Sequence, residues 1–155
     1  VVLFQAEDGI RGLVRSRGRG DVYKRQAKKI LLVEDDETLA NLLATHLEHN
    51  NAKVVIETEG SRALETAMTE IPDLILLDIL LPGMDGFQVL AQVRADSFLK
   101  NTPVVIISNL DSASDFAEAE KLGVSDYIVK STSLLDDIAR KSLVALNLPV
   151  PEKES

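Results

Sequence analysis

The fold is decided by one stretch, Asp73-Leu74-Ile75-Leu76-Leu77-Asp78-Ile79-Leu80-Leu81-Pro82-Gly83-Met84-Asp85-Gly86. An apolar run of this length, bounded by turn residues, is typical of a strand buried on both faces of a sheet. The run ends in Asp78, and an ionised carboxylate in such a place is costly unless a cation meets it. We therefore expect the rest of the chain to supply the partners of Asp78.

Four more short apolar runs predict strands on either side of this one. The five predicted strands are 29–33, 54–56, 73–77, 104–107 and 127–129. Segments with helical spacing separate and follow them, at 39–47, 61–69, 87–94, 112–122 and 135–146. Alternation of this kind predicts an α/β fold, a doubly wound sheet of five parallel strands with right-handed crossovers and helices on both faces.

The first and fourth helices carry particular signals. In 39–47, the spacing of Leu39, Leu42, Leu43, His46 and Leu47 predicts one apolar face, with His46 as a partly buried packing residue. The fourth helix is followed by a glycine at residue 123, where a helix end favours a left-handed residue.

Composition limits the classes of function. The 155 residues, 45% of them hydrophobic, suit one domain with a single core. No apolar run is long enough to span a membrane, so we expect no membrane insertion. Without cysteine the chain has no disulfide or thiolate metal site, which fits a cytoplasmic location. Residues 27–155 hold 11 basic and 22 acidic side chains, which argues against direct contact with nucleic acid.

The first 26 residues differ from the rest. They carry six basic side chains, three acidic ones and four glycines, and they show no helical or strand period. They lack the apolar segment of a secretory signal. The string resembles a translated sequencing-adapter read-through, so we expect an unstructured or artefactual extension and exclude it from the fold.

Polar residues follow four of the predicted strands. Glu34 and Asp35 follow the first, Asp78 the third, Ser108 the fourth and Lys130 the fifth. Ligands of open α/β sheets bind beyond the carboxyl ends of the strands, so we expect these side chains to meet. Three clustered carboxylates call for a cation, and an all-oxygen site favours Mg²⁺ over zinc.

Four motifs in order carry a resemblance to a known family. They are Leu31-Leu32-Val33-Glu34-Asp35-Asp36, then Leu76-Leu77-Asp78 through Pro82-Gly83-Met84-Asp85-Gly86, then Ile107-Ser108, and then Tyr127-Ile128-Val129-Lys130. The segment from about Lys28 to Leu146 resembles the receiver domain of bacterial two-component response regulators, in a single-domain, chemotaxis-regulator-like form.

The resemblance implies a flavodoxin-like sheet of strand order 2-1-3-4-5, with a receiver domain at 27–148 and a polar tail at 149–155. It also implies phosphoryl transfer from a sensor histidine kinase or phosphotransfer protein to Asp78, the phosphoacceptor. Asp35 and Asp78 would hold Mg²⁺, with Glu34 acting through water. Lys130 and the hydroxyl of Ser108 would contact phosphoryl oxygens.

The remaining implications concern the output. Tyr127 is the expected switch residue, moving from an exposed to a buried position and altering a surface that a downstream protein target reads. The chain would be a monomer or a phosphorylation-dependent dimer. It would be a signalling phosphoacceptor, not an enzyme, that assists only its own phosphorylation and dephosphorylation.

Alternative interpretations stay open at this point. A degenerate receiver would act as a phosphorylation-independent interaction module. A phosphatase with an aspartate nucleophile is disfavoured, because it would want an acid where Leu80 stands. Among single residues, Asp36 fits a helix cap, Ser108 an ordinary strand-end hydroxyl and Tyr127 plain core packing. Asp85 and Gly86 fit turn formation.

Two departures from the family pattern affect the site. Ser131 follows Lys130 where the family usually has a proline in a cis peptide. Because a cis bond without proline costs about 2.5–4 kcal/mol, we expect either a trans bond with a reshaped loop or a strained one. Leu80 and Leu110, each two residues beyond a site residue, are apolar, and we expect them to hinder attacking water and lengthen the life of the aspartyl phosphate.

Overall fold

The computed structural model describes residues 27–152. The predicted extension at 1–26 and the last residues of the polar tail, 153–155, lie outside the described residues. The five apolar runs form the strands β1 (Lys28–Val33), β2 (Ala52–Glu57), β3 (Leu74–Leu77), β4 (Val104–Ser108) and β5 (Asp126–Val129). All neighbours are parallel and the order is β2-β1-β3-β4-β5, which confirms the predicted flavodoxin-like topology.

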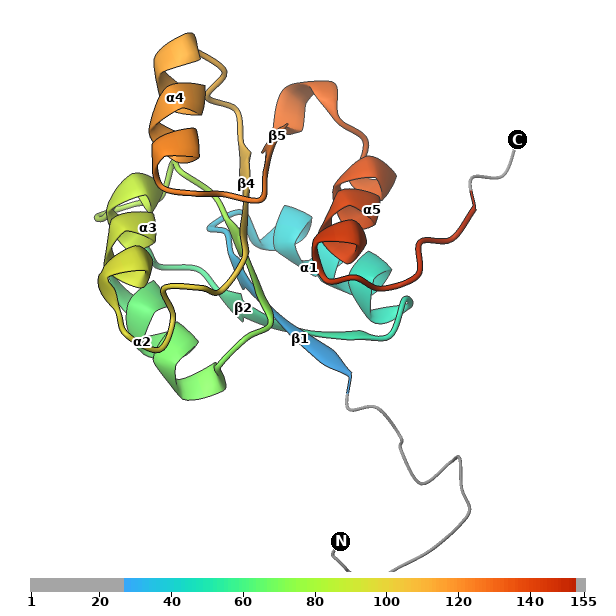
Figure 1. The fold of residues 1–155 in the computed structure, drawn as a ribbon. Coiled ribbons are helices and arrows are strands. Elements are labelled where there is room, and N and C mark those ends of the chain that lie inside the picture. Colours follow the sequence, from blue (N-terminus) through green and yellow to red (C-terminus); the bar gives the residue numbers. More distant parts are fainter. Residues whose placement is uncertain (1–26, 153–155) are drawn as a thin grey trace, which may run out of the picture.

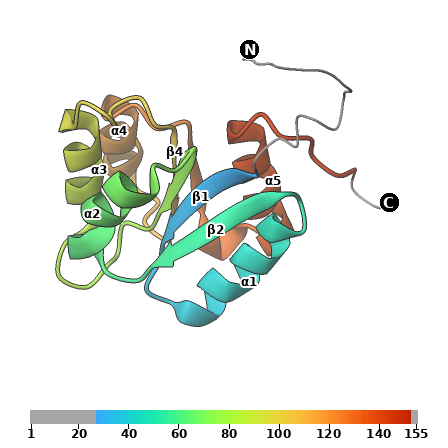
Figure 2. The ribbon, with the colours of Figure 1, turned by 90° about the horizontal axis from the view of Figure 1, so that it is seen from below.

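In the part of the chain that the structure describes, five α-helices connect and follow the strands, as Figure 1 illustrates. They are α1 (Glu37–Glu48), α2 (Gly60–Glu70), α3 (Gly86–Ala95), α4 (Ala113–Lys121) and α5 (Leu135–Ala145). Figure 2 shows α1 and α5 on one side of the sheet and α2, α3 and α4 on the other. The two helical layers bury separate apolar clusters against opposite faces of the sheet.

Strand β3 shows why its sequence is apolar without interruption. Leu74 and Leu76 belong to the core under α1 and α5, whereas Ile75 and Leu77 belong to the core under α2, α3 and α4. Successive side chains of a strand point to opposite faces, so both sets must be apolar when both faces are covered. Asp78 is the first residue beyond this buried strand.

The face predicted for α1 was partly wrong. The buried residues are Ala40, Leu43, Ala44 and Leu47, whereas Leu42 and His46 are exposed. The imidazole of His46 lies 3.2 Å from the carbonyl oxygen of Leu42, one turn earlier. Small alanines fit closest to the sheet, and the apolar stripe is therefore rotated away from the larger side chains that the sequence pattern favours.

The helix ends near the site follow local rules. Asp85 caps α3 and forms a capping box with Gln88, and Ser112 does the same for α4 with Asp115. Each box satisfies backbone N–H groups that the first helical turn leaves without partners. Gly123 follows α4 with φ of 72°, which confirms the predicted left-handed position.

The departure at Ser131 has a simple outcome. Residues 27–152 contain no cis peptide bond, so the bond between Lys130 and Ser131 is trans, and Lys130–Thr132 forms one turn of 3₁₀ helix, η2. The alternative of a trans bond with a reshaped loop is therefore confirmed. This turn begins directly at Lys130, whose side chain still reaches the other strand ends.

Candidate functional site

The strand register brings the predicted site residues to one edge of the sheet. Val33 of β1 is paired with Leu77 of β3, and the backbone N–H of Asp78 donates to the carbonyl oxygen of Val33 at 3.0 Å. The residues that follow this pair, Glu34 and Asp78, therefore leave the sheet together. On the other side of β3, β4 ends at Ser108, which is paired with the last residue of β5 before Lys130.

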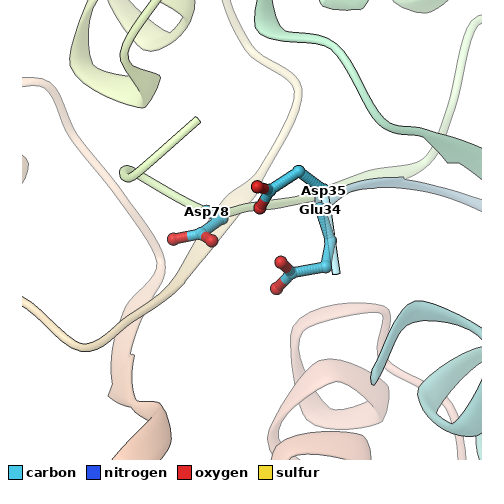
Figure 3. A group of neighbouring side chains, drawn as sticks. All are labelled: Glu34, Asp35 and Asp78. Atoms are coloured by element: carbon cyan, nitrogen blue, oxygen red, sulfur yellow. The ribbon is translucent and has the colours of Figure 1, made fainter. Parts of the chain in front are cut away.

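Glu34, Asp35 and Asp78 form a cluster of carboxylates (Figure 3). One carboxylate oxygen from each residue lies within 4.8 Å of those from the other two. Glu34 and Asp78 are buried, whereas Asp35 is exposed. Two buried anions side by side repel each other and require positive charge nearby.

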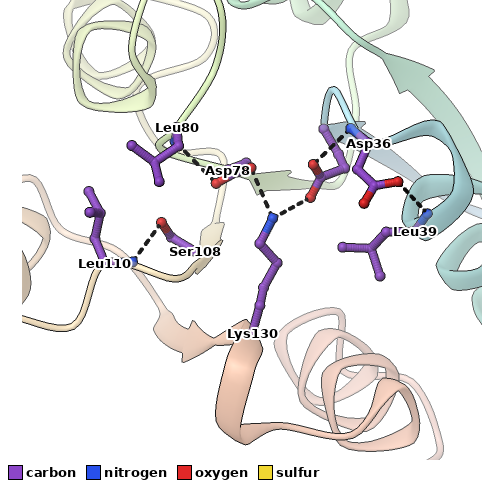
Figure 4. Close-up of polar contacts among 8 residues, drawn as sticks. Asp36, Leu39, Asp78, Leu80, Ser108, Leu110 and Lys130 are labelled. Atoms are coloured by element: carbon purple, nitrogen blue, oxygen red, sulfur yellow. Dashed lines mark hydrogen bonds and ion pairs between the residues drawn. The ribbon is translucent and has the colours of Figure 1, made fainter.

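Lys130 supplies one positive charge to the cluster. Its Nζ donates to Oε1 of Glu34 at 2.9 Å and to Oδ2 of Asp78 at 3.0 Å (Figure 4). Burial alone would lower the pKa of Lys130, but its hydrogen bonds to the two carboxylates outweigh burial and leave that pKa raised. The lysine is therefore held in its charged form, and it ties the end of β5 to the ends of β1 and β3.

Glu34 occupies the deepest position of the three. Burial raises the pKa of Glu34, and the charge of Asp78 adds to this effect, while hydrogen bonds from Asp36 and Lys130 oppose it. Its Oε2 accepts the backbone N–H of Asp36 at 3.1 Å. Both oxygens of Glu34 thus have donors within the protein.

The second oxygen of Asp78 is also engaged. Its Oδ1 accepts the backbone N–H of Leu80 at 3.1 Å, while Oδ2 is bound to Lys130. Sequence reasoning missed the Leu80 N–H, because a side chain gives no sign of where its main-chain donor points. The only available signal was the turn residues from Pro82 onward, which bend the chain back towards the strand end.

The donor set suits a divalent cation. Three carboxylates face one ammonium group, so the cluster retains excess negative charge. All the side-chain ligands are oxygen, which is the donor type that Mg²⁺, Ca²⁺ and Mn²⁺ prefer. The exposed carboxylate of Asp35 leaves one side of the cluster open to solvent, where a cation that keeps several waters fits.

Asp36 does not join the cluster. Its Oδ1 accepts the backbone N–H of Leu39 at 3.1 Å, which makes it the N-cap of α1, as predicted. It also lines a hollow of about 250 Å³ beside the site that the sequence did not indicate. The other lining residues are Leu39, Asn109, Lys130, Ser131, Ser133, Leu135 and Ile138.

Ser108 and Tyr127 connect the site to α4. Ser108 is fully buried, and its Oγ accepts the backbone N–H of Leu110 at 3.2 Å. The hydroxyl of Tyr127 donates to the carbonyl oxygen of Leu110 at 2.7 Å, and its ring packs edge-on against Phe116 of α4 with centroids 4.7 Å apart. Burial raises the pKa of Tyr127, and the charge of Asp115 raises it further. Tyr127 is half-buried in this arrangement.

Leu80 and Leu110 hold equivalent places in their loops. Each donates its backbone N–H to the functional side chain two residues earlier, Asp78 for Leu80 and Ser108 for Leu110. Leu80 is 55% exposed and Leu110 is half-buried, and Figure 4 shows the two hydrogen bonds. Both leucines therefore lie next to a predicted site residue, and their hindrance of attacking water stays a prediction.

The sequence matches a known protein family and several curated proteins. The sequence model of the response regulator receiver domain matches residues 30–140. Over 103 residues the chain is 40% identical to the transcriptional regulatory protein RstA of Escherichia coli (strain K12), covering 66% of this chain and 42% of that protein. The chain spans about half, or less, of the length of the curated relatives that it matches.

Two solved structures show the same architecture. The BeF3-activated N-terminal receiver domain of Klebsiella pneumoniae RstA aligns with a TM-score of 0.67 at 38% identity, covering 76% of this chain and 98% of that one. The Mn(2+)-bound form of response regulator Rcp1 aligns with a TM-score of 0.68 at 30% identity, covering 81% and 99%. Within residues 27–152, no helix has the length and apolar character needed to cross a membrane.

Proposed function

This chain belongs to the response regulator receiver domain family of two-component systems, and from that premise we propose that Asp78 accepts a phosphoryl group from a phosphohistidine. A sensor histidine kinase or a phosphotransfer protein would be the donor. The observation that carries the proposal is the position of the Lys130 Nζ, 3.0 Å from Asp78 and 2.9 Å from Glu34. This lysine places a positive charge directly beside the buried carboxylate that would react.

The proposed reaction is a direct displacement at phosphorus. A carboxylate oxygen of Asp78 forms a bond to phosphorus as the bond between phosphorus and the imidazole nitrogen of the donor breaks. The electron pair of the broken bond stays with the imidazole. Lys130 and the hydroxyl of Ser108 would then contact phosphoryl oxygens, since positioning and charge stabilisation provide most of the catalysis in such transfers.

Glu34, Asp35 and Asp78 would hold Mg²⁺, which when bound offsets negative charge on the transferred group. The all-oxygen donor set and the excess of carboxylates over cations support this assignment. Asp35 supplies the accessible carboxylate, and the buried Glu34, already bonded to Lys130, suits an indirect contact through water. The similar protein Rcp1 was solved in a Mn(2+)-bound form, which supports the binding of a divalent cation by this chain.

The proposed output is a conformational signal to a downstream protein target. Recruitment of Ser108 to the phosphoryl group would pull on Leu110, whose carbonyl oxygen receives the Tyr127 hydroxyl. Tyr127 would thus report the state of the site to α4 through Phe116. The equilibrium between two such states is what phosphorylation would shift, in a monomer or by favouring a dimer.

The chain would work in the cytoplasm as a phosphoacceptor without turnover of a separate substrate. The curated relatives include transcriptional regulators, and those proteins extend well beyond the segment matched here. For residues 27–155 we expect no direct contact with nucleic acid, because acidic side chains outnumber basic ones 22 to 11.

Acetyl phosphate with Mg²⁺, followed by intact mass, tests the proposal. We expect a gain of one phosphoryl group, and no gain in the Asp78→Asn chain. Asp73→Asn is the matched control, because Asp73 precedes the same strand and lies at its opposite end, where it accepts the backbone N–H of Lys29. No gain in the unaltered chain would instead support a phosphorylation-independent interaction module.

A further inference from the structure

Helix α4 is attached unevenly to the rest of the molecule. Ala119, near its C-terminal end, is the only one of its nine residues that is buried. Beyond the helix, Leu122 and Val124 pack against the core. The N-terminal half contributes one ring contact, between Phe116 and Tyr127, and most of its surface is exposed.

Arg94 of α3 forms hydrogen bonds at the C-terminal end of α4, which is the better-attached end. Its Nε donates to the carbonyl oxygen of Leu122 at 2.8 Å, and Nη2 donates to that of Gly123 at 3.0 Å. Its Nη1 donates to the carbonyl oxygens of Thr102 at 2.8 Å and Lys100 at 3.2 Å, in the loop before β4. One guanidinium therefore joins three segments, and α3 and α4 lie on the same side of the sheet (Figure 2).

The chemistry of this contact favours arginine. All four acceptors are neutral main-chain carbonyl oxygens, two of them at the C-terminal end of a helix, where the backbone carries partial negative charge. A guanidinium presents several N–H groups in a rigid plane and can reach four oxygens at once. Lysine keeps the charge, but its single ammonium group does not reproduce that fork.

The opposite end of α4 faces the site. The helix begins after Ser112, four residues beyond Ser108, and the intervening loop holds the carbonyl oxygen of Leu110 that Tyr127 binds. Any rearrangement of Ser108 therefore reaches the N-terminal half of α4 directly. The C-terminal half is separated from the site by the length of the helix and is fixed by separate contacts.

We propose that Arg94 is the anchor of α4, so that phosphorylation at Asp78 moves the N-terminal half of the helix about a fixed C-terminal end. This inference rests on the proposed function, since it names how the signal leaves that site. Arg94 acts as a positioning residue: it touches no reacting group, and it decides which end of α4 is free to move.

Amide hydrogen exchange resolved by NMR on the full chain tests the anchor. In the unmodified protein, we expect acetyl phosphate with Mg²⁺ to alter exchange at 109–117 and to leave 119–125 nearly unchanged. In the Arg94→Lys chain, exchange at 119–125 should rise at least about tenfold before phosphorylation, given the usual strength of hydrogen bonds to charged groups. Phosphorylation should then alter both halves of the helix.

Arg62→Lys is the matched control, because Arg62 is 64% exposed and its nearest acidic atom, in Glu57, is 4.0 Å away. It should leave exchange in α4 unchanged. Amides of β1 serve as the reference within each chain. Exchange at 119–125 is expressed relative to theirs, so a general loss of stability does not affect the comparison. Unchanged relative exchange at 119–125 in the Arg94→Lys chain would overturn the anchor.

Two further outcomes are informative. Equal phosphorylation-dependent changes at both ends of α4 in the unmodified chain would also overturn the proposal. Intact mass, recorded on the same samples, reports whether the phosphoryl group was taken up. Without uptake the proposed function fails. The anchoring by Arg94 is then tested by exchange at 119–125 in the unphosphorylated unmodified and Arg94→Lys chains.

Discussion

Gly86 lies against the peptide group of Asp78, and its replacement by alanine tests whether close packing positions this proposed phosphoacceptor. A Cβ atom at residue 86 would lie 2.2 Å from the carbonyl oxygen of Asp78 and 2.7 Å from Cα of Ile79. Real Cβ contacts are essentially never shorter than 3.0 Å. The Asp78 peptide must therefore move by roughly 1 Å, and a misplacement of that size can lower a rate by about a hundredfold.

We expect the Gly86→Ala chain to take up phosphoryl groups about ten to a hundred times more slowly than the unmodified chain. We also expect its free energy of unfolding to fall by about 1–3 kcal/mol, as in other overpacked sites. Local relaxation is limited because the backbone N–H of Gly86 donates to the carbonyl oxygen of Ile79 at 2.8 Å. The two segments cannot separate without losing that bond.

Gly83→Ala in the same turn provides the control. Gly83 has φ of 83°, but no atom lies within 4 Å of the position that its Cβ would occupy. This substitution should cost about 1–2 kcal/mol through the backbone alone and leave Asp78 in place. The assay compares initial phosphorylation by acetyl phosphate, read by intact mass, with urea unfolding of each chain. Equal phosphorylation rates in the two alanine chains would refute positioning by Gly86.

Three other predictions concern the neighbours of Asp78. Replacing Leu80 and Leu110 together with asparagine or glutamine should shorten the life of the aspartyl phosphate several-fold, and an unchanged rate of phosphate loss would contradict the hindrance of water. Lys130→Met should lower the free energy of unfolding by about 3 kcal/mol, because it leaves buried carboxylates unpaired; urea unfolding should show part of the loss restored by Mg²⁺. Since the pKa of Tyr127 is raised above 10.0 in the folded chain, the free energy of unfolding should fall as the pH rises past that value. Tyr127→Phe should remove this part of the pH dependence. If urea unfolding gives the same dependence on pH for the two chains, Tyr127 is not its source.

Most of the fold was predictable from the periodicity of apolar residues. A strand covered on both faces must be apolar throughout, and β3 satisfies this at every position from Leu74 to Leu77. Helix α1 was predicted less well, because the pattern gives weight to large side chains. The sheet instead accepts Ala40 and Ala44, which allow close approach, and leaves Leu42 in solvent.

The composition of the candidate site was predictable for a geometric reason. Alternating strands and helices give parallel strands, which present their carboxyl ends at one edge of the sheet. The residues that follow each strand therefore come together there, however the helices pack. The partners within the site were not predictable. Whether Lys130 pairs with Glu34, Asp78 or both depends on the conformation of a four-carbon side chain. The reach of Arg94 was likewise invisible, since its acceptors are main-chain atoms with no sequence signature.

Lys130 and Arg94 each join segments that are far apart in the sequence, at different places in the molecule. Lys130 ties the end of β5 to β1 and β3 at the carboxyl edge of the sheet. Arg94 joins the end of α4 to the loop that enters β4, at the other end of that strand. Between these contacts lies the segment from Ser108 to Phe116, where the hydroxyl of Tyr127 binds the carbonyl oxygen of Leu110 and Phe116 packs against the Tyr127 ring. On the proposed function, a change in charge at Asp78 would act beside Lys130, and we expect its effect to reach this segment before the C-terminal end of α4.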